Sequence, residues 1–159
     1  MRAEAGRFLA SSKQADAQMQ TMTADEARAF LLERPRTAKL ATVRADGRPH
    51  IAPIWFDLDG AQLVFTTWHT TVKATNLRRD PRVSLCVDDE APPFAFVIIE
   101  GTAMLPEDLA ELRMWATRIA ARYMGQAQAA AFGARNGVPG ELLVRVQPTR
   151  IIGQGDVAG

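Results

Sequence analysis

LATVRADGRPHIAPIWF, residues 40–56, predicts two strands joined by a tight turn. The β-branched and small apolar residues over 39–44 are typical of a strand. Ala45-Asp46-Gly47 supplies the glycine of a hairpin turn, and a second strand is expected over 50–56. Pro53 has no N–H to donate, so the second strand is expected to lie at an edge, to contain a bulge or to lack a neighbour.

The regions on either side of this hairpin continue the pattern. A turn over 57–60 and a strand over 62–67 predict a second hairpin, and two hairpins in succession form an antiparallel meander. Further strands are expected over 82–88, 94–103, 142–146 and 150–152. Helices are expected after a capping box at Thr23 and over 70–79, 106–123 and 126–135. Six or seven strands without alternating β–α order predict an α+β, mainly β fold built on a small barrel with peripheral helices.

Length and periodicity define the domain organisation. A chain of 159 residues can bury one working core. Residues 1–20 are rich in Ala, Gln, Ser and charge and have no clear periodicity. We expect a flexible N-terminal extension over 1–20 and one folded domain over 21–159.

Composition excludes several classes of protein. Lys plus Arg number 19 and Asp plus Glu 18, a balance that argues against a dedicated nucleic-acid binder. No run approaches ~18 apolar residues, and the charged start does not resemble a secretory signal. One cysteine, Cys86, and two histidines are too few for an internal disulfide or for most zinc sites. We expect a cytoplasmic protein that binds no metal, nucleic acid or membrane.

The chain lacks the common catalytic motifs. It contains no G-x-G-x-x-G, P-loop, G-x-S-x-G or H-E-x-x-H sequence. Candidate general acids and bases are sparse, and no catalytic residue is assigned. A cofactor that carries its own reactivity would suit such a chain, because the protein then supplies position and electrostatics.

The segment over 65–76, FTTWHTTVKATN, holds the densest group of polar residues. It predicts a strand that leads into a helix. Thr66 and Thr67 at the strand end and Lys73 in the first helical turn would suit an anionic phosphate, with the helix N-terminus adding to the attraction. Ordinary helix capping beside one exposed lysine is the alternative.

Other residues carry weaker signals. His50 and His69 have no partner in sequence and are more often surface residues than catalysts. The aromatic residues Trp55, Phe56 and Trp68 could stack on a planar ring or fill the core. Three arginines surround Asp80-Pro81: Arg78, Arg79 and Arg82. They form either a solvated helix end or an anchor for a polyanionic tail.

These segments together resemble a known family. Residues 40–56, Phe65-Thr66-Thr67, Lys73 and the run over 76–83 are similar to the pyridoxamine 5′-phosphate oxidase-like split β-barrel superfamily. The similarity covers about residues 23–153 and is greatest for its branch of oxidoreductases that depend on coenzyme F420, a deazaflavin, of the B type.

The resemblance implies a six-stranded antiparallel split barrel that forms a homodimer, with a cofactor in each of two grooves at the subunit interface. It implies that the cofactor ring lies along the second strand and that its phosphate lies near the strand-to-helix junction. Arg48 or the arginines near Asp80 would meet the glutamyl tail. The cofactor-binding residues implied are Arg48, Ile51, Pro53, Ile54, Trp55, Thr66, Thr67, Lys73, Asn76 and Arg78.

The leading hypothesis is an oxidoreductase in which reduced F420 passes a hydride to a conjugated, electron-poor small molecule, such as a quinone or a biliverdin-like tetrapyrrole. An FMN-binding flavoprotein is the alternative cofactor class. Members that oxidise pyridoxamine phosphate carry a basic residue before the phosphate lysine, where this chain has Val72. A carrier of the cofactor or of a tetrapyrrole without catalysis, and a dimeric structural module without a ligand, are further alternatives.

Overall fold

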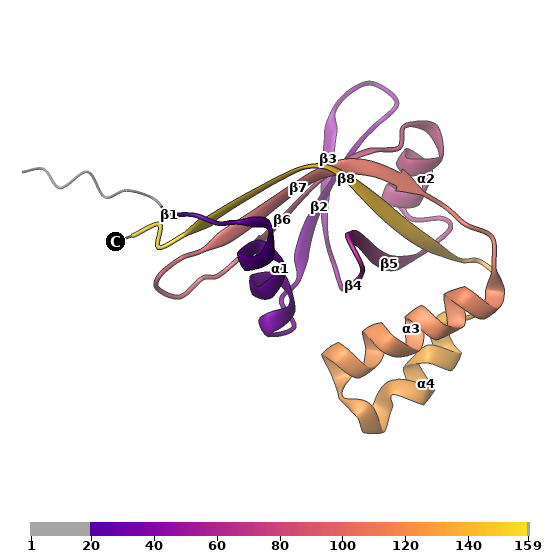
Figure 1. Ribbon diagram of the computed structural model, residues 1–159. Helices are drawn as coiled ribbons and strands as arrows, with labels where there is room; N and C mark the ends of the chain where they lie inside the picture. Colours follow the sequence, from indigo (N-terminus) through magenta and orange to yellow (C-terminus); the bar gives the residue numbers. More distant parts are fainter. Residues whose placement is uncertain (1–19, 159) are drawn as a thin grey trace, which may run out of the picture.

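The structure, a computed structural model, describes residues 20–158 (Figure 1). It is a mainly β fold with four helices, as predicted. The strands are β1 Gln20–Thr21, β2 Ala38–Val43, β3 Pro49–Ile54, β4 Asp57–Asp59, β5 Gln62–Trp68, β6 Arg82–Asp88, β7 Phe96–Met104 and β8 Glu141–Gly155. The helices are α1 Ala24–Glu33, α2 Val72–Arg79, α3 Leu109–Met124 and α4 Gln126–Asn136. The predicted extension over 1–20 lies outside the described residues, apart from Gln20 in β1.

The sheet is antiparallel throughout, and its strand order forces it to curl. The order is β3-β2-β6-β7-β8-β5-β4, with β1 paired to β8 beside this path. The two end strands, β3 and β4, are consecutive in the chain and are joined by only Trp55 and Phe56. A connection of two residues keeps both ends of the path together, so the sheet wraps into a barrel-like shape.

The main path has seven strands, which agrees with the six or seven expected from the residues and is one more than the six that the resemblance implies. We expected 57–60 to be a turn, but Asp57–Asp59 forms β4 and pairs with β5. Leu58 is buried opposite Leu63, and burial of this pair stabilises a strand that the flanking aspartates disfavour. The turn itself is confined to Gly60 and Ala61.

The C-terminal region forms one long strand rather than the two expected over 142–146 and 150–152. β8 pairs with β5 through its first half and with β7 along most of its length. Pro148 lies between the two expected strands. The pairing shifts register between Glu100 and Gly101 of β7, opposite Pro148, and an irregularity of this kind accommodates a residue without an N–H.

The hairpin and the first helix form as their sequences predict. The β2–β3 register runs from Ala38 opposite Ile54 to Val43 opposite Pro49, and Gly47 takes the positive φ of 84° that the turn requires. β3 is an edge strand of the path, which explains why Pro53 is tolerated. Thr23 and Glu26 form the capping box of α1.

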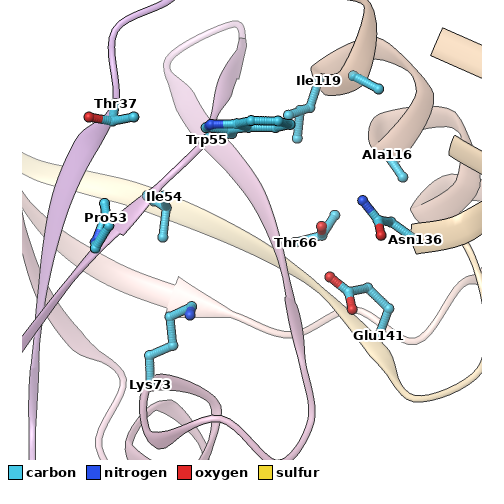
Figure 2. A pocket seen from close by; sticks show the side chains of 11 residues that line it. Thr37, Pro53, Ile54, Trp55, Thr66, Lys73, Ala116, Ile119, Asn136 and Glu141 are labelled. Atoms are coloured by element: carbon cyan, nitrogen blue, oxygen red, sulfur yellow. The ribbon is translucent and has the colours of Figure 1, made fainter. Parts of the chain in front are cut away.

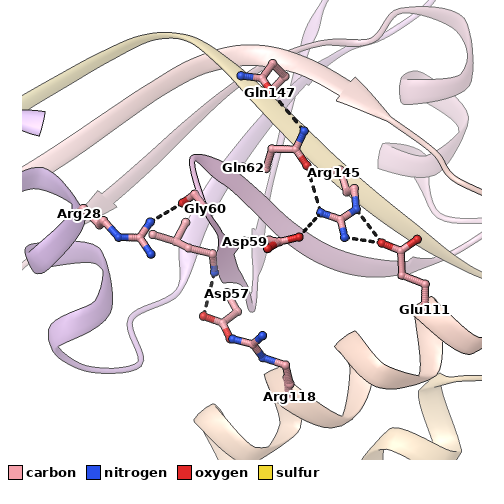
Figure 3. Close-up of polar contacts among 10 residues, drawn as sticks. Arg28, Asp57, Asp59, Gly60, Gln62, Glu111, Arg118, Arg145 and Gln147 are labelled. Carbon is pink, nitrogen blue, oxygen red and sulfur yellow. Dashed lines mark hydrogen bonds and ion pairs between the residues drawn. The ribbon is translucent and has the colours of Figure 1, made fainter. Parts of the chain in front are cut away.

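Helices α3 and α4 form a hairpin beside the β4–β5 end of the sheet (Figure 1). Trp115 of α3 is buried with Val64, Leu112 and Leu143, apart from the main core cluster. Arg145 of β8 bonds to Glu111 of α3 and, at 2.8 Å, to Asp59 of β4 (Figure 3). These contacts hold the helical hairpin at a set position against the sheet.

Candidate functional site

A cavity of about 380 Å³ lies where β3, β5, α2 and the α3–α4 hairpin meet (Figure 2). Its lining residues are Thr37, Pro53, Ile54, Trp55, Thr66, Lys73, Ala116, Ile119, Ala120, Asn136 and Glu141. The walls are apolar, and the polar groups gather toward α2 and the start of β8. Lys73 is the cation of this lining and Glu141 is its anion.

Half of the predicted cofactor-binding residues line this cavity: Pro53, Ile54, Trp55, Thr66 and Lys73. The end of β3 brings the first three, because Trp55 and its two predecessors run along the cavity wall. Thr66 comes from β5 and Lys73 from the first turn of α2, and Figure 2 shows both on the polar side. Three segments separated in sequence therefore line one cavity.

Thr67 and Asn76 do not line the cavity, and both are only 3% exposed. The Thr67 hydroxyl lies 3.0 Å from the hydroxyl of Thr71, which is the N-cap residue of α2. Asn76 donates to the Thr42 hydroxyl of β2 at 2.9 Å. These two side chains fix the position of α2, and so they place Lys73, while contributing no group to the cavity.

The remaining predicted residues lie farther out. Ile51 is 66% exposed on the edge strand β3. Arg48 pairs with Asp46 at 2.7 Å and borders a second hollow of about 380 Å³ beside α2. Arg78 donates to the backbone oxygen of His69 at 3.0 Å and borders a different cavity. The structure therefore places these residues around the main cavity and not within it.

Trp55 forms a rigid wall of the cavity. Its ring stacks on Tyr123 of α3 with centroids 4.9 Å apart and planes 6° from parallel. The Tyr123 hydroxyl donates to the backbone oxygen of Arg36 at 2.6 Å and accepts from the Phe56 N–H at 3.2 Å. Burial raises the pKa of Tyr123, so the hydroxyl stays protonated and the stack stays in place.

The three predicted aromatic candidates have different environments. Phe56 is fully buried in the core, which confirms the packing interpretation for this residue. Trp55 and Trp68 are 38% and 41% exposed. Trp68 packs against His69 outside the cavity, with ring centroids 4.8 Å apart.

His50 lies on β3 near the cationic end of the site. Burial lowers its pKa, and the charges of Arg44 and Lys73 lower it further. Its Nδ1 is buried without a hydrogen-bond partner among the described residues. A histidine held neutral in this way adds no positive charge beside Lys73.

Glu141 is the charged residue among the six lining residues that the sequence did not predict. It starts β8, opposite Trp68 of β5, and its carboxyl group is directed into the cavity near Thr66 and Asn136 (Figure 2). Burial raises its pKa, while the neighbouring Thr66 hydroxyl and the charge of Lys73 act in the opposite direction. The sequence feature that could have indicated Glu141 is its position as an acidic residue directly before the apolar run 142–144.

The sequence profile of the pyridoxamine 5′-phosphate oxidase family matches residues 23–155. The chain belongs to this family. The resemblance expected from 40–56 and from the strand-to-helix junction is thereby confirmed at family level, and the wrapped antiparallel sheet agrees with it.

Proteins similar to this chain include two whose names mention coenzyme F420. The chain is 29% identical over 139 residues to an F420H2-dependent biliverdin reductase of Mycobacterium tuberculosis, covering 86% of this chain and 92% of that protein. A conserved hypothetical protein of Mycobacterium tuberculosis superimposes with a TM-score of 0.74 at 27% identity, covering 86% of each chain. A protein described as an F420 reductase superimposes with a TM-score of 0.61 at 28% identity, covering 77% of this chain and 94% of the other.

The cavity suits a planar ring that carries an anionic group nearby. Pro53, Ile54 and Ile119 provide apolar walls for a flat ring. Lys73 points into the cavity (Figure 2) and forms no ion pair within residues 20–158. An unpaired ammonium group at this place can neutralise a phosphate.

Within the described part of the chain, no cluster of three His, Cys, Asp or Glu side chains has the arrangement of a metal site. Across residues 20–158, no helix combines the length and apolarity needed to cross a bilayer.

Proposed function

We propose that this protein is an oxidoreductase that uses reduced coenzyme F420 to transfer a hydride to a conjugated, electron-poor small molecule. A biliverdin-like tetrapyrrole or a quinone is the substrate class. The observation that carries the proposal is the cavity in which Lys73 and Thr66 lie at one end of an apolar wall formed by 53–55. The two relatives named for F420 support the choice of deazaflavin over FMN.

In this proposal, the residues of the chain bind and orient the cofactor. Lys73 neutralises the phosphodiester of the cofactor, and Thr66 lies beside it. The end of β3 lies along the ring, and Trp55, fixed by Tyr123, keeps that wall from collapsing. The bound deazaflavin supplies the hydride. The protein raises the rate by holding the two reactants about 3–3.5 Å apart and by excluding water.

The second hollow suits the acidic tail of the cofactor. Arg44, Arg48 and Arg79 border it, and Asp46 is the one acid of its lining. Arginine forms two parallel hydrogen bonds with a carboxylate. We assign this hollow to the glutamyl tail, with Asn76 fixing the helix that carries Arg79.

We further propose that the protein works as a cytoplasmic homodimer, with β3 at the subunit interface. β3 is an edge of the main sheet path, and its outward residues Ile51 and Pro53 are exposed. An exposed apolar edge strand invites association unless it is covered. A partner there would also close the open side of the cavity.

Parallel titrations with coenzyme F420 and FMN test the function. We expect saturable binding of F420, measured by fluorescence, with FMN bound more weakly. Reduced F420 should then be oxidised in the presence of biliverdin or a quinone, measured by absorbance. Tight binding without turnover of either substrate would favour a carrier, and preference for FMN with oxygen-dependent reoxidation would favour a flavoprotein. Absence of F420 binding would overturn the proposal.

A further inference from the structure

A carboxyl group occupies the end of the cavity assigned to an anion. Glu141 is half-buried, and Figure 2 shows its carboxyl group on the same side of the cavity as Thr66, with Lys73 pointing toward that space. Two negative charges confined together in a partly buried site repel each other strongly. A phosphate that binds to Lys73 must therefore contend with Glu141.

Hydrogen-bond donors are limited at this end of the cavity. Thr66 has a single hydroxyl proton, and the Glu141 carboxyl group lines the same side of the cavity. An ionised Glu141 carboxylate therefore competes with a phosphate oxygen for that proton. When Glu141 is protonated, its carboxyl group can donate to the Thr66 oxygen, and the Thr66 proton becomes free for the phosphate.

We propose that Glu141 couples anion binding to proton uptake. When an anion binds at Lys73 and Thr66, the Glu141 carboxyl group carries a proton. The proton comes from solvent and no covalent bond changes. The identity of the anion, the phosphodiester of F420, rests on the proposed function. The coupling of anion to proton rests on the position of Glu141 in the cavity beside Thr66 and Lys73.

The charged surroundings of Glu141 agree with such coupling. The charged or titratable groups that border its two cavities or lie beside it are Lys73 and Arg78 of α2, His69 after β5, and Glu107 and Asp108 before α3. Burial already raises the pKa of Glu141. An arriving anion neutralises Lys73 and adds negative charge, so both effects raise that pKa further.

Proton uptake is the measurement that tests this inference. F420 binding is measured by calorimetry in two buffers of different ionisation enthalpy and by fluorescence titration from pH 6 to pH 8. Wild type is compared with Glu141→Gln, which keeps the size of the side chain and cannot ionise. Glu107→Gln is the matched control, because Glu107 is exposed and borders only the neighbouring cavity. Ionisations of the ligand itself are common to all variants and cancel.

On binding F420, wild type and Glu107→Gln should take up more protons than Glu141→Gln. Their affinity for F420 should fall as the pH rises, by up to about tenfold per pH unit, which is the limit for one coupled proton. Glu141→Gln should bind several-fold more tightly than wild type at pH 8. Equal proton uptake by wild type and Glu141→Gln would overturn the inference and leave the proposed function intact. If F420 does not bind at all, the proposed function fails. Sulfate, whose charge is constant from pH 6 to pH 8, then tests the inference: the measurement is how its stabilisation of the protein against unfolding depends on pH.

Discussion

Lys73 shows how much of the proposed chemistry depends on one side chain. It is the cation of the cavity lining, and its neighbours across the site are apolar or uncharged apart from Glu141. We predict that Lys73→Ala weakens F420 binding by about 1.5–3 kcal/mol, the contribution of one charge-assisted hydrogen bond. Fluorescence titration measures the change, and Lys73→Arg should keep most of the affinity. Unchanged affinity in Lys73→Ala would refute the phosphate assignment.

The pKa of Asp80, directly after α2, depends on Arg82. Hydrogen bonds from Arg82 lower the pKa of Asp80 to about 2 from its ordinary value of 3.8. Because the pKa of Asp80 is lower in the folded state than in the unfolded state, ionised Asp80 stabilises the folded protein at pH values above the unfolded-state pKa. This contribution is lost as the pH falls from about 4 to about 2.

We therefore predict that Asp80→Asn lowers the melting temperature at pH 7 and that the difference from wild type shrinks between pH 4 and pH 2. Thermal unfolding followed by circular dichroism measures it. In an Arg82→Gln background, which keeps the backbone N–H bond of residue 82 to Asp80, Asp80→Asn should have a smaller pH-dependent effect than in wild type. A difference that stays constant from pH 7 to pH 2 would contradict the assignment of Arg82 as the cause.

At the scale of elements, the α3–α4 hairpin depends on one close approach. Gly133 of α4 lies against Thr117 of α3, and a Cβ at Gly133 would lie 2.9 Å from the Thr117 Cα and 2.0 Å from its hydroxyl oxygen. Gly133→Ala should destabilise the protein by about 1–3 kcal/mol through overpacking. Urea unfolding measures it, and Ala134→Ser on the exposed face of α4 is the control. No loss of stability would show that the helices separate at little cost.

The position of α3 on the sheet depends on Asp57. This carboxylate is 9% exposed and contacts Arg118 at 3.3 Å and Arg122 at 3.4 Å. Arg122 is itself mostly buried, so its charge would be left without its acidic partner in an Asp57→Ala variant.

We predict that Asp57→Ala costs about 1–3 kcal/mol in unfolding free energy and speeds hydrogen exchange along α3. Arg118→Gln should cost less than about 1 kcal/mol, because Arg118 is half exposed to solvent. Equal effects of the two substitutions would mean that burial of Asp57 is not what anchors the helix.

At the scale of the whole molecule, the exposed edge strand predicts association. Light scattering coupled to gel filtration should give twice the chain mass of 17.4 kDa. Ile51→Asp should shift the protein toward the monomer, because it places a charge on the apolar edge. Leu109→Asp, an exposed change at the start of α3, should leave the mass unchanged. A wild-type monomer would refute the dimer and the shared groove with it.

Local patterns were sufficient for most elements. The β2–β3 hairpin follows from its glycine turn and β-branched residues, and α1 follows from its capping box. These features depend on residues a few positions apart, which the sequence lists in order. Pro53 predicted an edge, a bulge or a missing neighbour, since a missing donor is a property of one residue, and β3 is an edge of the path.

Prediction failed where burial in the folded core or a partner distant in sequence decided the outcome. The 57–59 segment became a strand because Leu58 is buried, and β8 continued through Pro148 because its partner β7 shifts register there. Neither the burial of Leu58 nor the register of β7 is visible in the local pattern.

The residue types that determine the chemistry are present in the sequence: a lysine in a first helical turn, threonines at a strand end, and a proline-containing edge strand. Which of them face one cavity was decided by tertiary structure. Thr66 and Thr67 are adjacent, yet one lines the cavity and the other is buried against Thr71, since neighbouring residues of a strand point to opposite faces. Glu141 joins Lys73 across 68 positions of sequence because β8 pairs with β5, and only the folded sheet brings an acid and a base to the same end of one cavity.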